Sequence, residues 1–233
     1  MTATEFDKLA GDLRALAQGT PLHWGAVQSD GRDARLTERR FFALRTYEAL
    51  EEAVGAFPDE AKAYFRRRWF LWQCARCDEY LFCLNPNVHP NPNSRDKGYD
   101  IAFDEGIRFD VKGTVIPKQM REASPLCVAG LMAHPLPIIR FYYDKQSHGR
   151  RFDMQNRLFV VHHSFVDEHR ELYLRCAWRT KREAYREYAR NIGRIAFREW
   201  QGCKASVLFI VERRRGVDDR WLGSFAKTFH INI

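Results

Sequence analysis

The N-terminal part of the chain repeats hydrophobic positions at helical intervals. In residues 4–17 the hydrophobic side chains recur every three or four positions, so that they share one face of a helix. A second helix is predicted from Thr37, a residue type that caps helix N-termini well, to about Gly55. Pro58 suits a first helical turn, and neither glycine nor proline interrupts residues 59–82, so we expect a long third helix there.

The rest of the chain is predicted to mix short strands with helices. Residues 85–93 contain three prolines, which lack amide donors and restrict the residue before them, so this segment is predicted to be a loop. The other predicted elements are a hairpin over 99–115, strands at 138–143, 158–163 and 205–212, a helix over 179–200 and an edge strand over 227–233. Together they predict an α/β fold with a mixed sheet flanked by helices.

The predicted hairpin separates its hydrophobic and polar side chains onto two faces. Every second residue of 99–103 and of 107–111 is large and hydrophobic, which places one face of each strand in the core. Arg108, Asp110 and Lys112 in the second strand therefore share the opposite face. Asp110 and Lys112 are neighbours on that face because side chains alternate along a strand.

The loop between the two strands determines which residues face each other. A loop of three residues that ends in Gly106 joins the strands, and a left-handed backbone is common at its last position. If Phe103 faces Ile107, Asp100 lies opposite Asp110, with Cβ atoms roughly 5 Å apart. Two carboxylates this close repel each other unless a cation lies between them.

A hard divalent cation suits two facing carboxylates. Mg²⁺ prefers oxygen ligands and retains waters that a phosphate can replace, and Mn²⁺ can substitute for it. Hydrolysis of a phosphodiester needs a metal ion that activates water and a cation that stabilises charge on the phosphoryl oxygens. Asp100 and Asp110 meet the first need, and Lys112 meets the second. The competing interpretation is a solvated hairpin face on which Arg108, Asp110 and Lys112 only form salt bridges.

Composition and charge narrow the class of protein. With 45% hydrophobic and 29% charged residues the chain is typical of globular proteins, and no uninterrupted hydrophobic stretch is long enough to span a bilayer. The N-terminus lacks the basic and hydrophobic segments of a signal peptide, so we expect a cytoplasmic protein with no membrane partner. A formal net charge of +8 favours polyanionic partners. Cys74 and Cys77 are predicted to be reduced core residues rather than zinc ligands.

The hairpin residues resemble the signature of the PD-(D/E)xK nuclease superfamily, which includes many restriction, recombination and repair nucleases. In that family one acidic residue lies on the first strand of a hairpin, and an acidic residue and a lysine lie on the second. Asp100, Asp110 and Lys112 take these three places as catalytic residues. Tyr99 stands where the signature has proline.

The resemblance also implies a fourth residue and a fold. The family often adds a metal-binding acidic residue from a preceding helix, and Glu79 near the end of the third predicted helix is the candidate, with Asp78 as its competitor. The implied fold is restriction-endonuclease-like, with a mixed sheet flanked by helices. It would consist of an N-terminal helical segment at 1–57 and a nuclease-like core at 58–233.

The activity implied by the resemblance is metal-dependent hydrolysis of phosphodiester bonds. DNA is the more frequent substrate in the family, endonucleolytic cleavage is the expected mode, and restriction or defence is the expected role. Cutting both strands of a duplex would imply a homodimer. Two alternatives stay open, namely a nucleic-acid-binding protein without activity and a nuclease directed at RNA. The candidate contacts to nucleic acid are the basic residues Arg66, Arg67, Arg108, Lys118, Arg213 and Arg214.

Overall fold

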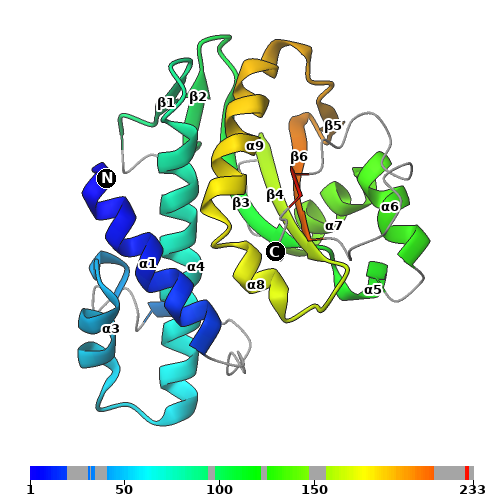
Figure 1. The fold of residues 1–233 in the computed structure, drawn as a ribbon. Helices are drawn as coiled ribbons and strands as arrows, with labels where there is room; N and C mark the ends of the chain where they lie inside the picture. The colour runs from blue at the N-terminus through cyan, green and yellow to red at the C-terminus, as the bar shows by residue number, and fades with distance from the viewer. Residues whose placement is uncertain are drawn as a thin grey trace. The chain divides into compact units, whose positions relative to one another are not determined.

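The computed structural model describes residues 1–19, 31, 33–34, 41–93, 98–121, 125–146, 156–212 and 229–230. Contacts between residues divide the chain into two compact units, Met1–Tyr80 and Leu81–Ile233. In the described residues the first unit is helical, and the second contains a sheet with helices (Figure 1). The contacts thus group the long third helix with the N-terminal helices, although the sequence assigned it to the nuclease-like core.

The N-terminal unit packs its helices around aromatic side chains. Its described elements are α1 (Ala3–Gly19), the 3-10 helix η1 (Phe41–Ala43), α3 (Tyr47–Val54) and α4 (Asp59–Phe82). Phe41, Phe57 and Phe65 lie at ring-centroid distances between 4.9 and 6.4 Å from one another. Such contacts bury large hydrophobic areas and hold the helices together. α1 and α4 confirm the first and third predicted helices.

The second predicted helix is wrong in its extent. The described chain there forms η1 and α3, and Thr46 caps α3 by accepting a hydrogen bond from the first turn at 3.2 Å. The break before Thr46 has a tertiary cause. The carbonyl of Leu44 accepts hydrogen bonds from the side chains of Trp69 at 3.0 Å and Gln73 at 2.8 Å, both on α4. Thr37, the predicted cap, lies outside the described residues.

The C-terminal unit is built on a mixed sheet. Its described strands are β1 (Val88–Pro90), β2 (Ile101–Phe103), β3 (Arg108–Val115), β4 (Arg157–Ser164), β5 (Arg198–Trp200), β6 (Cys203–Glu212) and β7 (Phe229–His230). They lie in the order β1-β2-β3-β4-β6-β5, and β7 pairs with β6. The β1–β2 and β2–β3 pairs are antiparallel, whereas β3, β4 and β6 run parallel. The predicted α/β class with a mixed sheet is confirmed.

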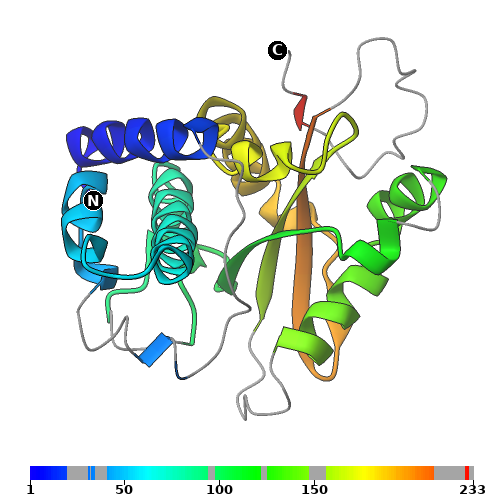
Figure 2. The same cartoon turned by 90° about the horizontal axis from the view of Figure 1, so that it is seen from below.

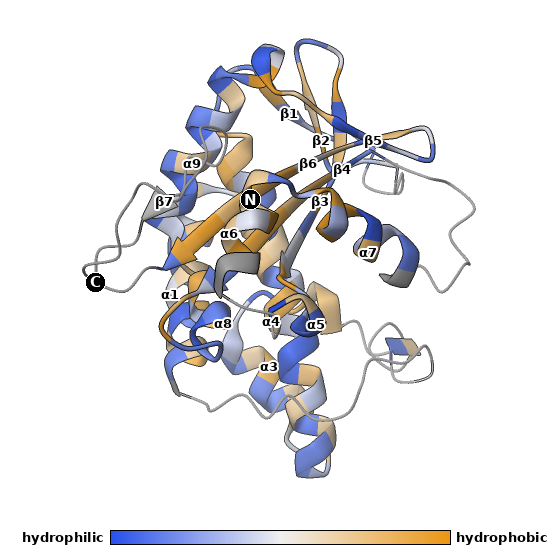
Figure 3. Cartoon of the chain, turned by 90° about the vertical axis from the view of Figure 1, so that its right-hand side faces the viewer, coloured by the Kyte–Doolittle hydropathy of each residue, from blue (hydrophilic) through white to orange (hydrophobic). Residues whose placement is uncertain are grey.

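Helices cover both faces of this sheet (Figure 2). The described helices are α5 (Lys118–Arg121), α6 (Pro125–Ala133), α7 (Leu136–Gln146), α8 (Arg170–Leu174), α9 (Trp178–Arg190) and the 3-10 helix η2 (Ile192–Arg194). α6 and α7 lie on one face, and α8 and α9 lie on the other. Ile138, Ile139, Phe159 and Phe209 are buried together between α7 and the sheet. Figure 3 shows β4 and β6 as hydrophobic along most of their length, as expected for strands covered on both faces.

Residues 138–143, predicted to be a strand, belong to α7. Ile138, Ile139, Tyr142 and Tyr143 are all buried, and their spacing of one and four positions defines a single helical face. Prolines at and just before the first turn suit a helix N-terminus. The prediction was wrong because a short hydrophobic run is compatible with either element.

Two other predictions are wrong in part. Residues 85–93 are not only a loop, since they contain β1, which pairs with β2 at the edge of the sheet, where proline is tolerated. The helix predicted over 179–200 ends at Arg190, where the Asn191 side chain donates to the carbonyl of Glu187 at 2.9 Å. The chain then continues through η2 into β5, which pairs antiparallel with β6.

The remaining predicted strands agree with the structure. The strands at 158–163 and 205–212 are confirmed as β4 and β6, each slightly longer than predicted. Of the final strand at 227–233, Phe229–His230 is described and pairs with β6 as β7. The parallel β3, β4 and β6 form the centre of the sheet, and β3 carries the hairpin residues.

Candidate metal centre

The β2–β3 hairpin has the register that its alternating pattern predicts. Ile101 pairs with Phe109, and Ala102 pairs with Arg108. Gly106 closes the loop with φ +78, in the left-handed region. The buried Ile101 and Phe109 show that the hydrophobic face of the hairpin lies in the core, as predicted.

Asp100 immediately precedes β2 and is tied to β3 by hydrogen bonds. Its backbone N–H donates to the carbonyl of Phe109 at 2.8 Å, and its Oδ2 accepts from the N–H of Val111 at 2.7 Å. The carboxylate therefore takes the place of a backbone carbonyl as the partner of a strand amide. This contact fixes the side chain against β3, beside the carboxylate of Asp110.

Asp110 is a buried carboxylate held between two cations. It is 4% exposed; the ammonium of Lys112 pairs with Oδ1, and Nε of Arg157 lies 3.4 Å from Oδ2. Arg157 is the first residue of β4 and faces Asp110 in the β3–β4 register. Its guanidinium lies 4.9 Å from the centroid of the Tyr143 ring on α7. Arg157 was not among the residues predicted from the sequence, because its only local signal is a charge directly before a hydrophobic run.

The two carboxylates interact electrostatically. Burial raises the pKa of the Asp100 carboxyl to about 6, while the charge of Lys112 opposes this rise and that of Asp110 adds to it. A carboxyl with this pKa is mostly ionised at neutral pH, so the hairpin then holds two negative charges in a small volume. Such a pair favours binding of a cation between its members.

The competing interpretation of a solvated salt-bridge face does not fit Asp110. Its side chain is buried beside Arg157, which in turn contacts Tyr143 of α7. The side chain of Lys112 is 32% exposed, and Arg108 is exposed, so solvent reaches only part of this face. An ion pair at a buried position is screened less by water than a surface pair.

The donor set of the hairpin fits a hard divalent cation. Asp100 and Asp110 supply carboxylate oxygens, and Mg²⁺ is commonly held by one or two carboxylates with waters and phosphate completing its shell. Within the part of the chain that the structure describes, no group of three or more His, Cys, Asp or Glu residues could hold a metal ion. Two carboxylates leave most of the coordination shell of such a cation to water and phosphate, whereas a structural zinc site is enclosed by four protein ligands.

The predicted helix carboxylate stays a prediction. Glu79 is half-buried and Asp78 is 2% exposed, and both belong to the last turns of α4 in the N-terminal unit. Burial makes Asp78 the less accessible of the two. Cys74 and Cys77, on the same helix, are buried free thiols, which confirms their prediction as core residues.

The predicted nucleic-acid contacts differ in how far they are already engaged. Nε of Arg66 donates to Glu51 at 2.7 Å, and Arg67 lies 5.5 Å from the centroid of the Tyr64 ring. Arg108 and Lys118 are exposed in the C-terminal unit. The remaining two candidates, at positions 213 and 214, lie outside the described residues.

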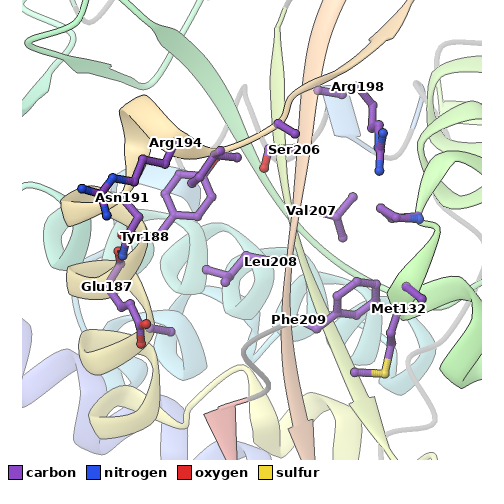
Figure 4. Close-up of a pocket in the computed structure, with 16 residues that line it drawn as sticks. Met132, Glu187, Tyr188, Asn191, Arg194, Arg198, Ser206, Val207, Leu208 and Phe209 are labelled. Carbon is purple, nitrogen blue, oxygen red and sulfur yellow. The ribbon is translucent and has the colours of Figure 1, made fainter. Parts of the chain in front are cut away.

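A separate hollow of about 390 Å³ is lined by residues of α6, α9 and β6 (Figure 4). In Figure 4, Tyr188 on α9 and Asn191 just beyond its end lie on one side of β6, and Met132 lies on the other. Exposed Arg194 and Arg198 add positive charge to its wall. None of the three hairpin residues lines this hollow, so it is not part of the candidate metal centre.

No protein-family model, curated protein or solved structure that was compared with the chain matches it. Among the described helices, none combines the length and the hydrophobicity that crossing a membrane requires.

Proposed function

We propose that the protein is a divalent-metal-dependent nuclease that hydrolyses phosphodiester bonds, with DNA as its substrate and endonucleolytic cleavage as its mode. The observation that carries this proposal is the position of Asp110, buried between Lys112 and Arg157 and beside Asp100. Two carboxylates with an adjacent lysine meet the needs of metal-assisted phosphodiester hydrolysis.

The topology of the C-terminal unit supports the proposal. The acidic residues lie before β2 and within β3, which form an antiparallel hairpin in a mixed sheet flanked by helices. This arrangement agrees with the fold that the PD-(D/E)xK resemblance implies. The restriction-endonuclease-like fold is therefore part of the proposal.

The hairpin residues have distinct roles in this reaction. A bound Mg²⁺ would polarise the phosphate and lower the pKa of a water nucleophile. Asp100 and Asp110 would hold the ion. The ammonium of Lys112 stabilises negative charge that builds on the phosphoryl oxygens, in a partly buried site where such an interaction is stronger than in water. The four charged groups of the site balance without a metal, so a divalent ion adds the positive charge that an anionic substrate requires.

The charge arrangement also argues against a purely binding role. A protein that only binds nucleic acid contacts phosphates through basic and neutral polar groups and has no need of two adjacent carboxylates beside a lysine. Hydrolysis of RNA uses the same metal chemistry, so the cleavage assay compares RNA with DNA as the substrate.

A cleavage assay tests the proposal directly. Plasmid, linear duplex and RNA are incubated with the purified protein in Mg²⁺, Mn²⁺ or EDTA. We expect nicked or linearised plasmid in either metal and none in EDTA. Lys112→Ala and Asp110→Ala are each expected to lower the cleavage rate by at least about 100-fold, the typical effect of removing one group that stabilises transition-state charge.

Matched controls come from the same unit. Asp104→Ala removes an exposed acid of the hairpin loop, and Lys204→Ala removes an exposed lysine of β6, so both should cleave at the wild-type rate. Metal-dependent cleavage that survives Lys112→Ala and Asp110→Ala would show that the site is elsewhere. Binding of nucleic acid without any cleavage would favour the non-catalytic alternative, and cleavage of RNA alone would replace DNA as the substrate.

A further inference from the structure

Arg157 is a charged residue at a fully buried position of the central sheet. It is 3% exposed and begins β4, whose next four residues are hydrophobic and completely buried. A buried charge is costly unless it is paired, so its partners define its role. The parallel register of β3 and β4 places Arg157 directly beside Asp110.

The contacts of Arg157 hold it in one orientation. Its Nε lies 3.4 Å from Oδ2 of Asp110, and its guanidinium lies 4.9 Å from the centroid of the Tyr143 ring. Its Nε and Nη1 atoms are buried, and neither donates a hydrogen bond of good geometry within the described residues. The guanidinium is therefore held by charge and by the aromatic ring, close to the carboxylate pair.

The two carboxylates of the site are held differently, since Asp100 accepts a hydrogen bond whereas Oδ2 of Asp110 is held by the 3.4 Å ion pair with Arg157 rather than by a hydrogen bond of good geometry within the described residues. Oδ2 of Asp100 accepts the N–H of Val111, and Oδ2 of Asp110 faces Arg157. The partner of Oδ1 of Asp110 is Lys112, whose side chain is 32% exposed, whereas the Arg157 side chain is only 4% exposed. Both side chains have flexible stems, but only that of Lys112 has solvent-exposed room to move.

We propose that Arg157 is a positioning residue whose buried charge holds the Asp110 carboxylate in the orientation in which it would bind a divalent cation. This inference rests on the proposed nuclease function. Arg157 then has two opposite effects. Its positive charge weakens binding of the cation, and its hold on Asp110 keeps the carboxylate in the orientation that the reaction requires.

Because loss of Arg157 should strengthen cation binding and slow cleavage, it can be distinguished from damage to the fold, which would weaken both. Arg157→Met removes the charge and keeps a long side chain, and Arg157→Lys keeps the charge but removes the planar fork. Arg140→Met is the matched control, because Arg140 is an exposed arginine of α7 whose guanidinium lies 4.6 Å from the centroid of the Trp200 ring, away from the carboxylates. Binding of Mn²⁺ is measured by calorimetry, and cleavage is measured at saturating Mn²⁺.

We expect Arg157→Met to bind Mn²⁺ about tenfold more tightly, because a positive charge within a few ångströms of the ion is removed. We expect the same variant to cleave about tenfold more slowly, since Asp110 is no longer held in place. Arg157→Lys should bind Mn²⁺ with an affinity within about twofold of wild type and still cleave several-fold more slowly. Arg140→Met should match wild type in both measurements.

The contrary results are equally specific. If Arg157→Met loses Mn²⁺ affinity and cleavage together, or changes neither, Arg157 has only a structural role or none. If Arg157→Met does not fold, Arg157→Lys decides, because a wild-type cleavage rate in that variant contradicts the positioning role. If the wild-type protein neither binds Mn²⁺ nor cleaves, the proposed nuclease function is wrong. That result is distinct from one in which the wild type is active and only the role of Arg157 is contradicted.

Discussion

Burial removes much of the water around the Asp100 carboxyl, and a second carboxylate lies beside it. Both effects raise the pKa of Asp100. Burial raises the pKa of Asp100 to about 6 from its ordinary value of 3.8, and the charge of Lys112 only partly opposes this. Between these two pH values the folded protein holds the proton more tightly than the unfolded chain. The raised pKa therefore contributes stability at low pH that is lost as the pH rises through about 6.

Asp100→Asn tests this linkage, because asparagine removes the charge while its carbonyl oxygen can still accept from the N–H of Val111. In EDTA at pH 8 we expect the variant to exceed wild type in unfolding free energy by about 1–2 kcal/mol, less than the full pKa shift would give because the site is partly exposed. At pH 4 the difference should disappear. Urea titrations at both pH values measure this difference in unfolding free energy.

Asp104→Asn, at an exposed position of the same hairpin, is the control and should show no comparable change. A difference for Asp100→Asn that is the same at pH 4 and pH 8 would contradict this assignment.

At the scale of elements, the hairpin loop determines the register that brings the carboxylates together. Gly106 has φ +78, a conformation that side chains with a Cβ rarely adopt, and a Cβ there would meet no atom within 4 Å. The cost of a substitution is therefore confined to the backbone. Because the loop joins β2 directly to β3, strain at this position acts on the strands that carry Asp100 and Asp110.

We expect Gly106→Ala to lower the free energy of unfolding by about 1 kcal/mol, and Gly106→Asn to cost less, because asparagine tolerates left-handed backbone. Denaturant titration measures both variants. Gly193→Ala serves as the control, since Gly193 has no positive φ and a Cβ there would also meet open space. That variant should be neutral or slightly stabilised by the reduced freedom of its unfolded chain. Equal effects at the two glycines would rule out strain at Gly106.

At the scale of the whole molecule, the excess of positive charge matters more than any single basic residue. The chain has 38 lysines and arginines against 30 acids. Part of this positive charge is neutralised by ion pairs within the protein, since Arg66 pairs with Glu51 and Arg68 pairs with Asp33. Arg108 and Lys118 are exposed. Nucleic acid is the proposed partner, and its binding releases counterions.

Binding of duplex DNA in EDTA should therefore weaken steeply with salt. For about five phosphate contacts, the association constant should fall roughly 500-fold between 50 and 200 mM salt. Arg108→Gln should reduce the slope of log affinity against log salt by about one. Lys8→Gln, at an exposed position of α1, is the control and should leave the slope unchanged. Fluorescence anisotropy with labelled duplex measures each slope, and affinity that does not vary with salt would exclude phosphate contacts.

Local patterns along the chain were sufficient to determine several elements and the centre of the site. The helices α1 and α4, the strands β4 and β6, and the register of the β2–β3 hairpin all followed from periodicity and turn composition. Asp110 and Lys112 share a face because strand side chains alternate, and this holds whatever packs against the strand. Such features depend on residues within about one element of each other.

Only the tertiary structure decided which side chains are buried and which distant strands are neighbours. Arg157 reaches Asp110 because β4 pairs with β3 in parallel, across more than 40 residues of intervening chain. Residues 138–143 form part of a helix because their hydrophobic face packs on the sheet, and Asp110 is buried beside Arg157, which contacts Tyr143 of that helix. Burial and long-range pairing are properties of the folded chain, and the electrostatics of the carboxylates depends on both.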